Sequence, residues 1–419
     1  MSKTNWCGFR LEREWVKIHS LLIYKLPYNM KNIYILLSFL FSILSFGQAN
    51  VGYALIDKKM AEIPQNSSAS TDAIANYINA NFKTENDKIR AVFYWTASKI
   101  SYDVKNMYAV TINENPQGRI AKTLKTKKGI CGDYAAIFNE IAALVGVKSV
   151  VIEGYTKQYG KVATLSHAWC AAKIDKKWYL FDPTWGSGSV YNGKFIKKRN
   201  DYYFKTEPEK IISSHIPFDY LWQFLNYPIT NQEFYDGKIQ VNKSKTYFDY
   251  QTAIDKYEKL SDGDKAFETA ERIQKNGILN NLILEQYKYK KNEFSILTQN
   301  INIEKLNSIT NDYNQAITLL NDFIYYRNKK FKPTLPDSEI SKMIQTPKEN
   351  LVKCQNDINF VGSVGSENAS SIASLKKNIY EALVQAEEYE TFVKEYLSKS
   401  KSGRKSMFTK VTWFGIPLN

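Results

Sequence analysis

A helical pattern followed at once by three strand patterns constrains the fold of this chain more than any other feature. The helical pattern runs from residue 131 to about residue 144, and its 3.6-residue spacing places Ile137, Phe138, Ile141 and Leu144 on one apolar face. Three segments rich in β-branched and aromatic residues follow, with the sequences KSVVIEGYT, SHAWCAAKI and KWYLFDPTW. A polar turn of two or three residues separates the last two, so they are expected to form an antiparallel hairpin. The predicted fold class is α+β, with a helix packed on an antiparallel sheet.

The composition of the chain changes near residue 245. Beyond this point glycine and proline become rare, and long patterns such as SIASLKKNIYEALVQAEEYETFVKEYLSK are amphipathic helices by their spacing. A length of 419 residues also suggests two or three domains. We therefore predict a mixed domain at residues 50–245 and an α-helical C-terminal domain at residues 246–419.

Residues 30–49 have the layout of a secretory signal peptide, which is a lysine, an apolar run over residues 33–46 and then small residues. The run is shorter than the ~20 residues that a membrane-spanning helix needs. Cleavage is expected after Gly47 or Ala49. Residues 1–29 are interpreted as over-called upstream residues. The predicted location is periplasmic or secreted, and an N-terminal membrane anchor is the alternative.

The net charge of +15 comes from 57 basic and 42 acidic residues that are mixed along the chain. This mixing is typical of a solvated basic surface, so no nucleic-acid partner is predicted. The sequence contains no GxxxxGK[ST] or GxGxxG motif, and its cysteines and histidines lack the spacing of metal ligands. We therefore predict no cofactor and no metal. Without residues 1–49 three cysteines remain, so at least one thiol cannot pair within the chain.

Cys131 stands at the predicted start of the helix, between Gly129 and Gly132 in the sequence GICGDYA. A helix N-terminus carries unpaired N–H groups and a partial positive charge, and both favour a thiolate. The two glycines permit a tight turn and the close approach of a substrate backbone, which makes them candidates for a substrate groove. A buried structural cysteine is the alternative.

His167 and Asp182 lie on the two strands of the predicted hairpin. With a turn of two or four residues they fall on the same face, so the carboxylate can orient the imidazole. An aspartate before a proline also commonly begins a turn. His215 is a weaker candidate for the base, because the sequence shows no carboxylate or strand partner for it.

The blocks GICGDYA, SHAW and WYLFDPTWG resemble the three motifs of the transglutaminase-like superfamily, which shares the papain-type cysteine fold. The resemblance covers about residues 85–190 and implies that Cys131, His167 and Asp182 are a catalytic triad. The later stretch YYFKTEPEKIISSHIPFDYLWQFL is similar to the segment that follows the core in bacterial kyphoscoliosis-peptidase-like members. Cys170 departs from the asparagine expected there and should face away from His167.

Three tryptophans are further candidates. Trp169 and Trp185 flank the hairpin and are candidates for the wall of a substrate groove, but core packing is the favoured role for both. Trp95 is a candidate oxyanion donor beside the backbone N–H of Cys131, although packing explains a tryptophan on a helix equally well.

These features predict an exported cysteine enzyme that acts on amide bonds of a protein or peptide substrate through an acyl-enzyme. The resemblance leaves protease, deamidase and transglutaminase chemistry open, and we favour hydrolysis over cross-linking. The alternative is a non-catalytic binding or scaffold module of the cell envelope. In that case the C-terminal helices would bind a partner or an envelope polymer.

Overall fold

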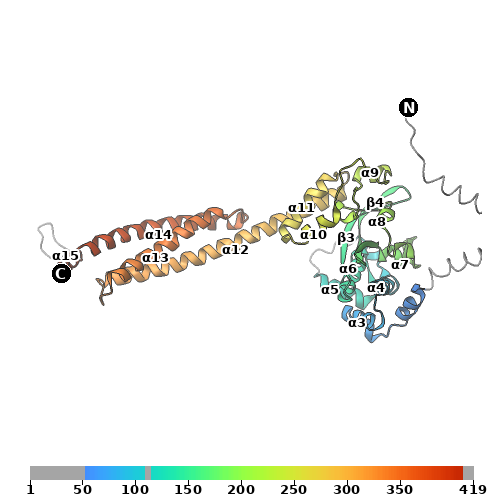
Figure 1. The fold of residues 1–419 in the computed structure, drawn as a ribbon, viewed down its shortest axis with the longest axis horizontal. Coiled ribbons are helices and arrows are strands. Elements are labelled where there is room, and N and C mark those ends of the chain that lie inside the picture. Colours follow the sequence, from blue (N-terminus) through green and yellow to red (C-terminus); the bar gives the residue numbers. More distant parts are fainter. Residues whose placement is uncertain (1–51, 109–114, 409–419) are drawn as a thin grey trace, which may run out of the picture. The chain divides into compact units, whose positions relative to one another are not determined.

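The computed structural model describes residues 52–108 and 115–408 (Figure 1). Within these ranges the chain forms two compact units, which divide between Tyr250 and Gln251. The predicted signal peptide at residues 30–49 and the upstream residues 1–29 lie outside the described residues.

The first unit contains a four-stranded antiparallel sheet with the strand order β5-β4-β3-β8. Its strands are β3 (Ser149–Gln158), β4 (Lys161–Ile174), β5 (Lys177–Phe181) and β8 (His215–Pro217). The first three are the strands that the sequence predicts, and β4 begins five residues earlier than its predicted segment. The fourth strand, β8, was not predicted.

The turn between β4 and β5 determines which side chains share a face of the sheet. Asp175 and Lys176 form a two-residue turn with φ angles of 50° and 68°. Positive φ at both positions matches the twist of the flanking strands. The ladder ends at Phe181, and the alternation of side chains places the next residue, Asp182, on the face that carries His167.

The helix α6 (Cys131–Leu144) packs against β3 and β4, and α3 (Thr71–Asn81) and α4 (Glu85–Lys99) pack against α6 (Figure 1). Three residues of the predicted apolar face of α6, Ile137, Phe138 and Ile141, are fully buried. Phe138 contacts Phe181 of β5 with ring centroids 5.3 Å apart. The prediction that Leu144 belongs to this face is wrong, because Leu144 is 39% exposed at the end of the helix.

Residues 200–240 contain several short elements. They are η3 (Asp201–Tyr203), α8 (Pro208–Ile211), β8, η4 (Tyr220–Gln223) and α9 (Asn231–Asp236). The strand β8 is the important one for the site, because it adds an edge to the sheet beside β3.

Short elements complete the first unit. A helix at residues 52–61 comes first. The others are η1 (Asn66–Ser68), β1 (Ser101–Tyr102), η2 (Val104–Asn106), α5 (Pro116–Thr126), β2 (Lys128–Gly129), α7 (Pro183–Ser187), β6 (Gly188–Tyr191) and β7 (Lys194–Lys197). The pair β1 and β2 is parallel, and the pair β6 and β7 is antiparallel.

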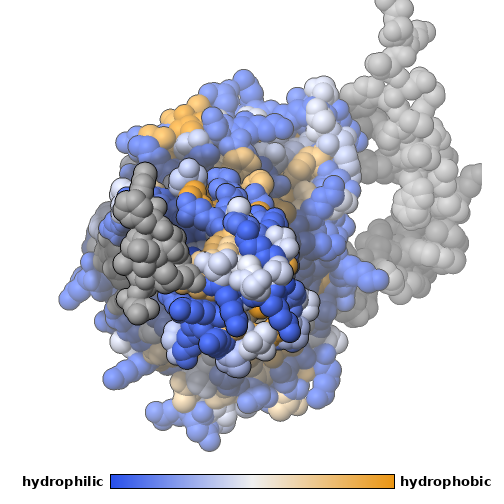
Figure 2. Space-filling model, turned by 90° about the vertical axis from the view of Figure 1, so that its left-hand side faces the viewer, coloured by the Kyte–Doolittle hydropathy of each residue, from blue (hydrophilic) through white to orange (hydrophobic). Residues whose placement is uncertain are grey.

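The second unit is helical, as the sequence predicts. Its elements are α10 (Tyr250–Tyr257), α11 (Asp262–Lys275), α12 (Asn281–Asn328), α13 (Asp337–Asp357), η5 (Ile358–Phe360), α14 (Ser366–Ser398) and α15 (Lys401–Ser406). The helices α12, α13 and α14 pack together around buried side chains such as Phe323, Ile344 and Ile379. The end of this bundle that faces the reader in Figure 2 is mostly hydrophilic. Among the described helices, none combines the length and the apolar character that crossing a membrane requires.

A buried ion pair links three parts of the first unit. Arg90 on α4 is 1% exposed and donates to both carboxylate oxygens of Asp57 at 2.8 and 2.7 Å. It also donates to Asp201 in η3 at 2.9 Å. Its guanidinium lies 4.7 Å from the ring centroid of Phe204. One buried cation therefore joins the helix at residues 52–61, α4 and η3.

We expect Arg90→Met to lower the free energy of unfolding of the first unit by about 3–5 kcal/mol, because it removes the buried guanidinium that donates to both oxygens of Asp57 and leaves only the partly exposed Arg199 beside that carboxylate. Arg199→Met is the matched control, since Arg199 also contacts Asp57, at 3.0 Å, but is 35% exposed in its side chain. This control should cost less than about 1 kcal/mol. Urea unfolding followed by tryptophan fluorescence measures both, because every tryptophan except Trp413 precedes residue 251. Equal losses in the two variants would contradict the prediction.

Candidate active site

Cys131 is the first residue of α6 and is half-buried. The turn before it is held by Asp133, whose Oδ2 accepts the backbone N–H of Ile130 at 2.9 Å. The Oδ1 of Asp133 accepts two N–H groups of Arg119, at 3.1 and 2.7 Å. Asp133 therefore fixes the chain on the N-terminal side of the sulfur.

Gly129 is required by close packing in this turn. A Cβ atom at this position would lie 2.8 Å from the Cβ of Asp133 and 3.1 Å from Cγ2 of Thr123, distances at which one neighbour must move. The contact with Asp133 is with the residue that fixes the turn, so a side chain here would displace the start of α6. Gly132 is less constrained, because its nearest neighbour would be Nη2 of Arg119 at 3.4 Å.

His167 lies on β4 between the sulfur and a carboxylate. Its Nε2 is 2.8 Å from Oδ2 of Asp182, and its ring is also hydrogen-bonded to the thiol of Cys131. Since Nε2 is occupied by Asp182, Nδ1 is the atom left to face the sulfur. The structure thus brings Cys131, His167 and Asp182 into one hydrogen-bonded chain.

Asp182 is fully buried and accepts hydrogen bonds at both carboxylate oxygens. It is the N-cap of α7, and its Oδ1 accepts the backbone N–H groups of Thr184 and Trp185 at 2.8 and 3.0 Å. Its Oδ2 is left for His167. Helix capping and the orientation of the histidine are therefore divided between the two oxygens.

The buried carboxylate and imidazole stabilise each other's charged form. Burial alone would lower the pKa of His167, but the charge and hydrogen bond of Asp182, together with Cys131, raise this pKa to about 10. Burial alone would raise the pKa of Asp182, but the same ion pair lowers it below its usual value. At neutral pH the pair is an imidazolium and a carboxylate.

The pKa of Cys131 is lowered from its ordinary value. Burial opposes this shift, but the hydrogen bond and positive charge of His167 outweigh it, and the backbone N–H of Ala168 adds a further hydrogen bond. Cys170 differs, because burial raises the pKa of its thiol well above the ordinary value. The Sγ of Cys170 points to the backbone oxygen of Ala135 in α6, at 3.5 Å, and so away from the site.

The structure gives His215, the weaker candidate for the base, partners that the sequence did not reveal. It lies on β8 opposite Thr156 of β3, and its Nε2 is 3.1 Å from the same Oδ2 of Asp182 that binds His167. Its Nδ1 is 2.8 Å from Oγ of Ser214. The statement that His215 lacks a carboxylate and a strand partner is therefore wrong. The scarcity of histidine in the chain was the one signal that could have pointed to it.

The two groove candidates Trp169 and Trp185 differ in their surroundings. Trp169 is 1% exposed and packs against the rings of His167 and His215, so it has the favoured core-packing role and does not wall an open groove. Trp185 is half-buried and contacts the ring of His215 at a centroid distance of 4.5 Å.

The prediction that Trp95 donates to an oxyanion is also wrong. Its indole is fully buried, and its Nε1–H donates to Oγ of Ser68 at 3.0 Å. Tyr102 is a polar residue near the site, and it pairs with Gly129 across β1 and β2. Burial raises the pKa of Tyr102 to about 12, and the negative charges of Cys131 and Asp182 add to this shift. Its phenol therefore stays protonated near the thiolate.

A pocket of about 330 Å³ lies beside the start of α6. Its lining also includes Gly129 and Ile130, and it carries charges of both signs, from Asp103, Arg119, Lys122, Lys128 and Asp133. Gly129 is the predicted groove residue that reaches a pocket. Gly132, Trp169 and Trp185 are not among the described residues that line it.

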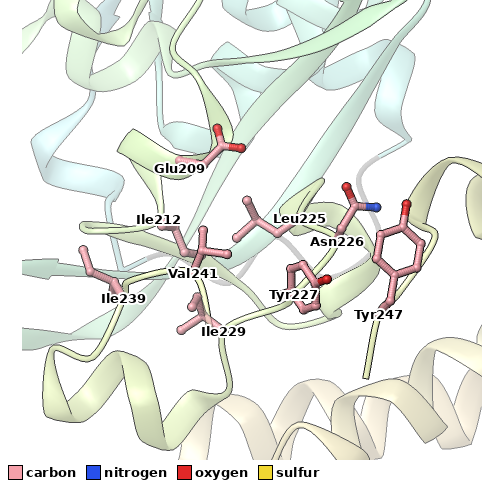
Figure 3. Close-up of a pocket in the computed structure, with 9 residues that line it drawn as sticks. All are labelled: Glu209, Ile212, Leu225, Asn226, Tyr227, Ile229, Ile239, Val241 and Tyr247. Atoms are coloured by element: carbon pink, nitrogen blue, oxygen red, sulfur yellow. The ribbon is translucent and has the colours of Figure 1, made fainter. Parts of the chain in front are cut away.

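A second pocket of about 230 Å³ lies away from the triad (Figure 3). The aliphatic side chains of Ile212, Leu225 and Val241 gather at its centre, and Glu209 and Asn226 lie toward its edges. It contains none of the predicted site residues, and no chemistry is assigned to it.

His167, Asp182 and His215 also form a group with the composition of a metal site, with ligand atoms all within 4.8 Å of one another. The same atoms are joined by two hydrogen bonds of 2.8 and 3.1 Å. A metal ion bound to these atoms would have to replace the proton of each hydrogen bond. The hydrogen bonds account for the arrangement without a metal.

The comparisons with known proteins agree with this geometry. Residues 72–183 match the family model described as the transglutaminase-like superfamily. The match includes Cys131, His167 and Asp182 and ends before His215.

The curated relatives are similar to about two fifths of this chain. Kyphoscoliosis peptidase of Homo sapiens is 31% identical over 172 residues, which are 39% of this chain and 25% of that protein. Hillarin of Drosophila melanogaster is 24% identical over 199 residues, which are 43% of this chain and 24% of that protein. The matched part thus spans about a quarter of each relative. Among solved structures, that of a TGase is 17% identical with a TM-score of 0.23, and the match covers 39% of this chain and 42% of that one.

We expect iodoacetamide to label Cys131 faster than Cys170 and Cys354 at pH 6–7. The thiolate is the reactive form, the pKa of Cys131 is lowered, and burial raises the pKa values of the other two thiols. Quenched labelling between pH 4 and 10 with peptide mass analysis gives the rate for each cysteine.

The matched variant is His167→Ala, which removes the imidazolium that lowers the pKa of Cys131. Its labelling curve should shift to higher pH, and its rate at pH 6 should fall on the order of 10-fold or more, which corresponds to one pKa unit. Equal labelling of the three cysteines in the native protein would contradict an ion pair between the Cys131 thiolate and the His167 imidazolium.

Proposed function

Because residues 72–183 carry a transglutaminase-like domain, we propose that this protein is a cysteine enzyme that attacks amide bonds of a protein or peptide substrate. The observation that carries the proposal is the hydrogen-bonded chain from Cys131 through His167 to the buried Asp182. A thiolate at a helix N-terminus, an imidazolium beside it and a carboxylate behind the imidazolium are the three groups that acyl transfer needs.

In the first half-reaction the Cys131 thiolate attacks the amide carbonyl carbon and forms a tetrahedral oxyanion. His167 then gives its proton to the leaving nitrogen, so that an amine departs and a thioester to Cys131 remains. Asp182 keeps the imidazole oriented throughout, because its Oδ2 holds Nε2 while Nδ1 faces the sulfur. The backbone N–H groups at the start of α6 supply donors for the oxyanion.

In the second half-reaction a nucleophile cleaves the thioester. Neutral His167 takes a proton from water or from a primary amine, and the product is a carboxylic acid or a new amide. We favour water as the acceptor. The relatives from Homo sapiens and Mus musculus are named as peptidases, which supports hydrolysis over cross-linking.

Single substitutions distinguish the proposed enzyme from a non-catalytic scaffold. We expect Cys131→Ala to abolish turnover of a peptide and glutamine-amide library, and Asp182→Asn to lower kcat by at least about 100-fold, because an amide no longer stabilises the imidazolium. Cys170→Ala is the matched control and should retain activity, since this thiol faces α6. Turnover that persists in Cys131→Ala would sink the proposal and favour a scaffold.

Whether water or an amine accepts the acyl group is tested with the same substrates in the presence of a fluorescent primary amine. If water is preferred, mass spectrometry will find mainly the acid product, with little amine incorporated at millimolar concentration. Amine incorporation that outpaces hydrolysis would assign transamidation to the same triad.

We also propose export, which rests on the sequence of residues 30–49. Expression of the full chain in a secreting host followed by N-terminal sequencing of the mature protein should find Gln48 or Asn50 as the first residue. A mature protein that begins at Met1 or Met30 and stays with the membrane would support an anchor instead.

A further inference from the structure

A second histidine binds the carboxylate of the proposed triad, and its role follows from where the sheet places it. His167 pairs with Gly154, and Gly154 pairs with Pro217 on β8. Residues opposite one another share a face, and so do residues two apart on a strand. His215, two residues before Pro217, is therefore on the face of the sheet that carries His167.

Gly154 allows the strand that carries His215 and the ring of Trp169 to pack closely on β3. A Cβ atom there would lie 2.2 Å from the backbone oxygen of Ile216 and 2.6 Å from Cη2 of Trp169. On the same face of the sheet, the ring centroids of His167 and His215 lie 5.6 Å apart. The close packing of β8 on β3 thus helps to place His215 beside His167.

The hydrogen bonds of His215 determine which ring nitrogen carries its proton. A carboxylate only accepts, so Nε2–H donates to Oδ2 of Asp182 at 3.1 Å. A neutral ring then has a lone pair at Nδ1, which accepts the hydroxyl proton of Ser214 at 2.8 Å. Burial lowers the pKa of His215, and repulsion from the His167 imidazolium adds to this, although Asp182 opposes both. His215 is therefore a neutral donor.

The groups that face His215 leave it little freedom to move. They are Asp182, His167, Ser214, Trp169, Trp185 and Tyr203. The side chain is 0% exposed. A ring held in this way presents its N–H to the carboxylate in one direction.

We propose that His215 is a positioning residue, which donates Nε2–H to Asp182 so that this carboxylate stays ionised and aimed at His167. The inference rests on the proposed function, because it assigns His215 to the reaction of Cys131. His215 does not contact the sulfur in this arrangement and acts through Asp182 and His167. The family match ends at residue 183, so this residue lies outside the matched segment.

Two substitutions of nearly equal size separate this role from mere packing. In His215→Gln the amide nitrogen can occupy the place of Nε2 and donate to Asp182. In His215→Asn the side chain is one carbon shorter, so its nitrogen takes the place of Nδ1 and does not reach the carboxylate. Both variants keep a polar, uncharged side chain at the site.

We expect His215→Asn to lower kcat about 10- to 100-fold with KM within about twofold of the native value, as for lost hydrogen bonds that orient a reacting group. Its Cys131 labelling curve should shift to higher pH, because a less stable carboxylate gives less support to the imidazolium. His215→Gln should stay within about threefold of the native enzyme in kcat. Near-UV circular dichroism of both variants confirms that they are folded.

The outcomes separate the inference from the proposed function. A native protein without a reactive Cys131 would contradict both. A reactive native Cys131, with kcat and labelling unchanged in folded His215→Asn, would overturn the inference alone. So would equal losses in the Asn and Gln variants.

A measurement on the unsubstituted protein covers the case in which a variant does not fold. The sequence has only three histidines, so ¹⁵N-histidine labelling gives few ring signals. Between pH 6 and 8 we expect a doubly protonated His167 and a neutral His215 with its proton on Nε2. A doubly protonated His215, or a proton on Nδ1, would overturn the assignment.

Discussion

The carboxylate of Asp182 is the group on which the site depends. It is fully buried, where an unpaired charge is unfavourable by several kcal/mol. Four donors offset this cost, two backbone N–H groups at the start of α7 and two imidazole N–H groups. These donors come from α7, β4 and β8, so the end of β5, the hairpin and the added edge strand must all be in place before the charge is stable. The geometry of His167 is a consequence of that requirement.

The Cys–His–Asp arrangement could be predicted from sequence because its parts are close in the chain. A two-residue turn relates His167 to Asp182, and alternation along the strands then places them on one face. The helix start at Cys131 was visible from glycines and periodicity. The structural and functional interpretations of Asp182 both hold, because one oxygen caps α7 and the other holds the histidine.

The surroundings of His215, Trp95 and Leu144 could not be predicted, because they depend on contacts with residues far away in sequence. His215 gains its role from the pairing of β8 with β3, which no local pattern near residue 215 specifies. The indole of Trp95 is taken by Ser68, a residue in a polar segment with no periodicity. Leu144 fits the apolar period of its helix but lies in the last turn, where the sheet no longer covers it. Periodicity defines a face, and tertiary packing decides how far that face is buried.

A neutral histidine suits position 215 better than a permanent cation would. Lysine or arginine there would also donate to Asp182, but its charge would compete with His167 for the carboxylate and lower the pKa of His167. The imidazolium would then hold its proton less firmly, and the thiolate of Cys131 would lose the charge that lowers its pKa. A neutral ring supplies the hydrogen bond without the charge. The buried site can therefore use its single carboxylate to support one ion pair, and that pair is the one next to the sulfur.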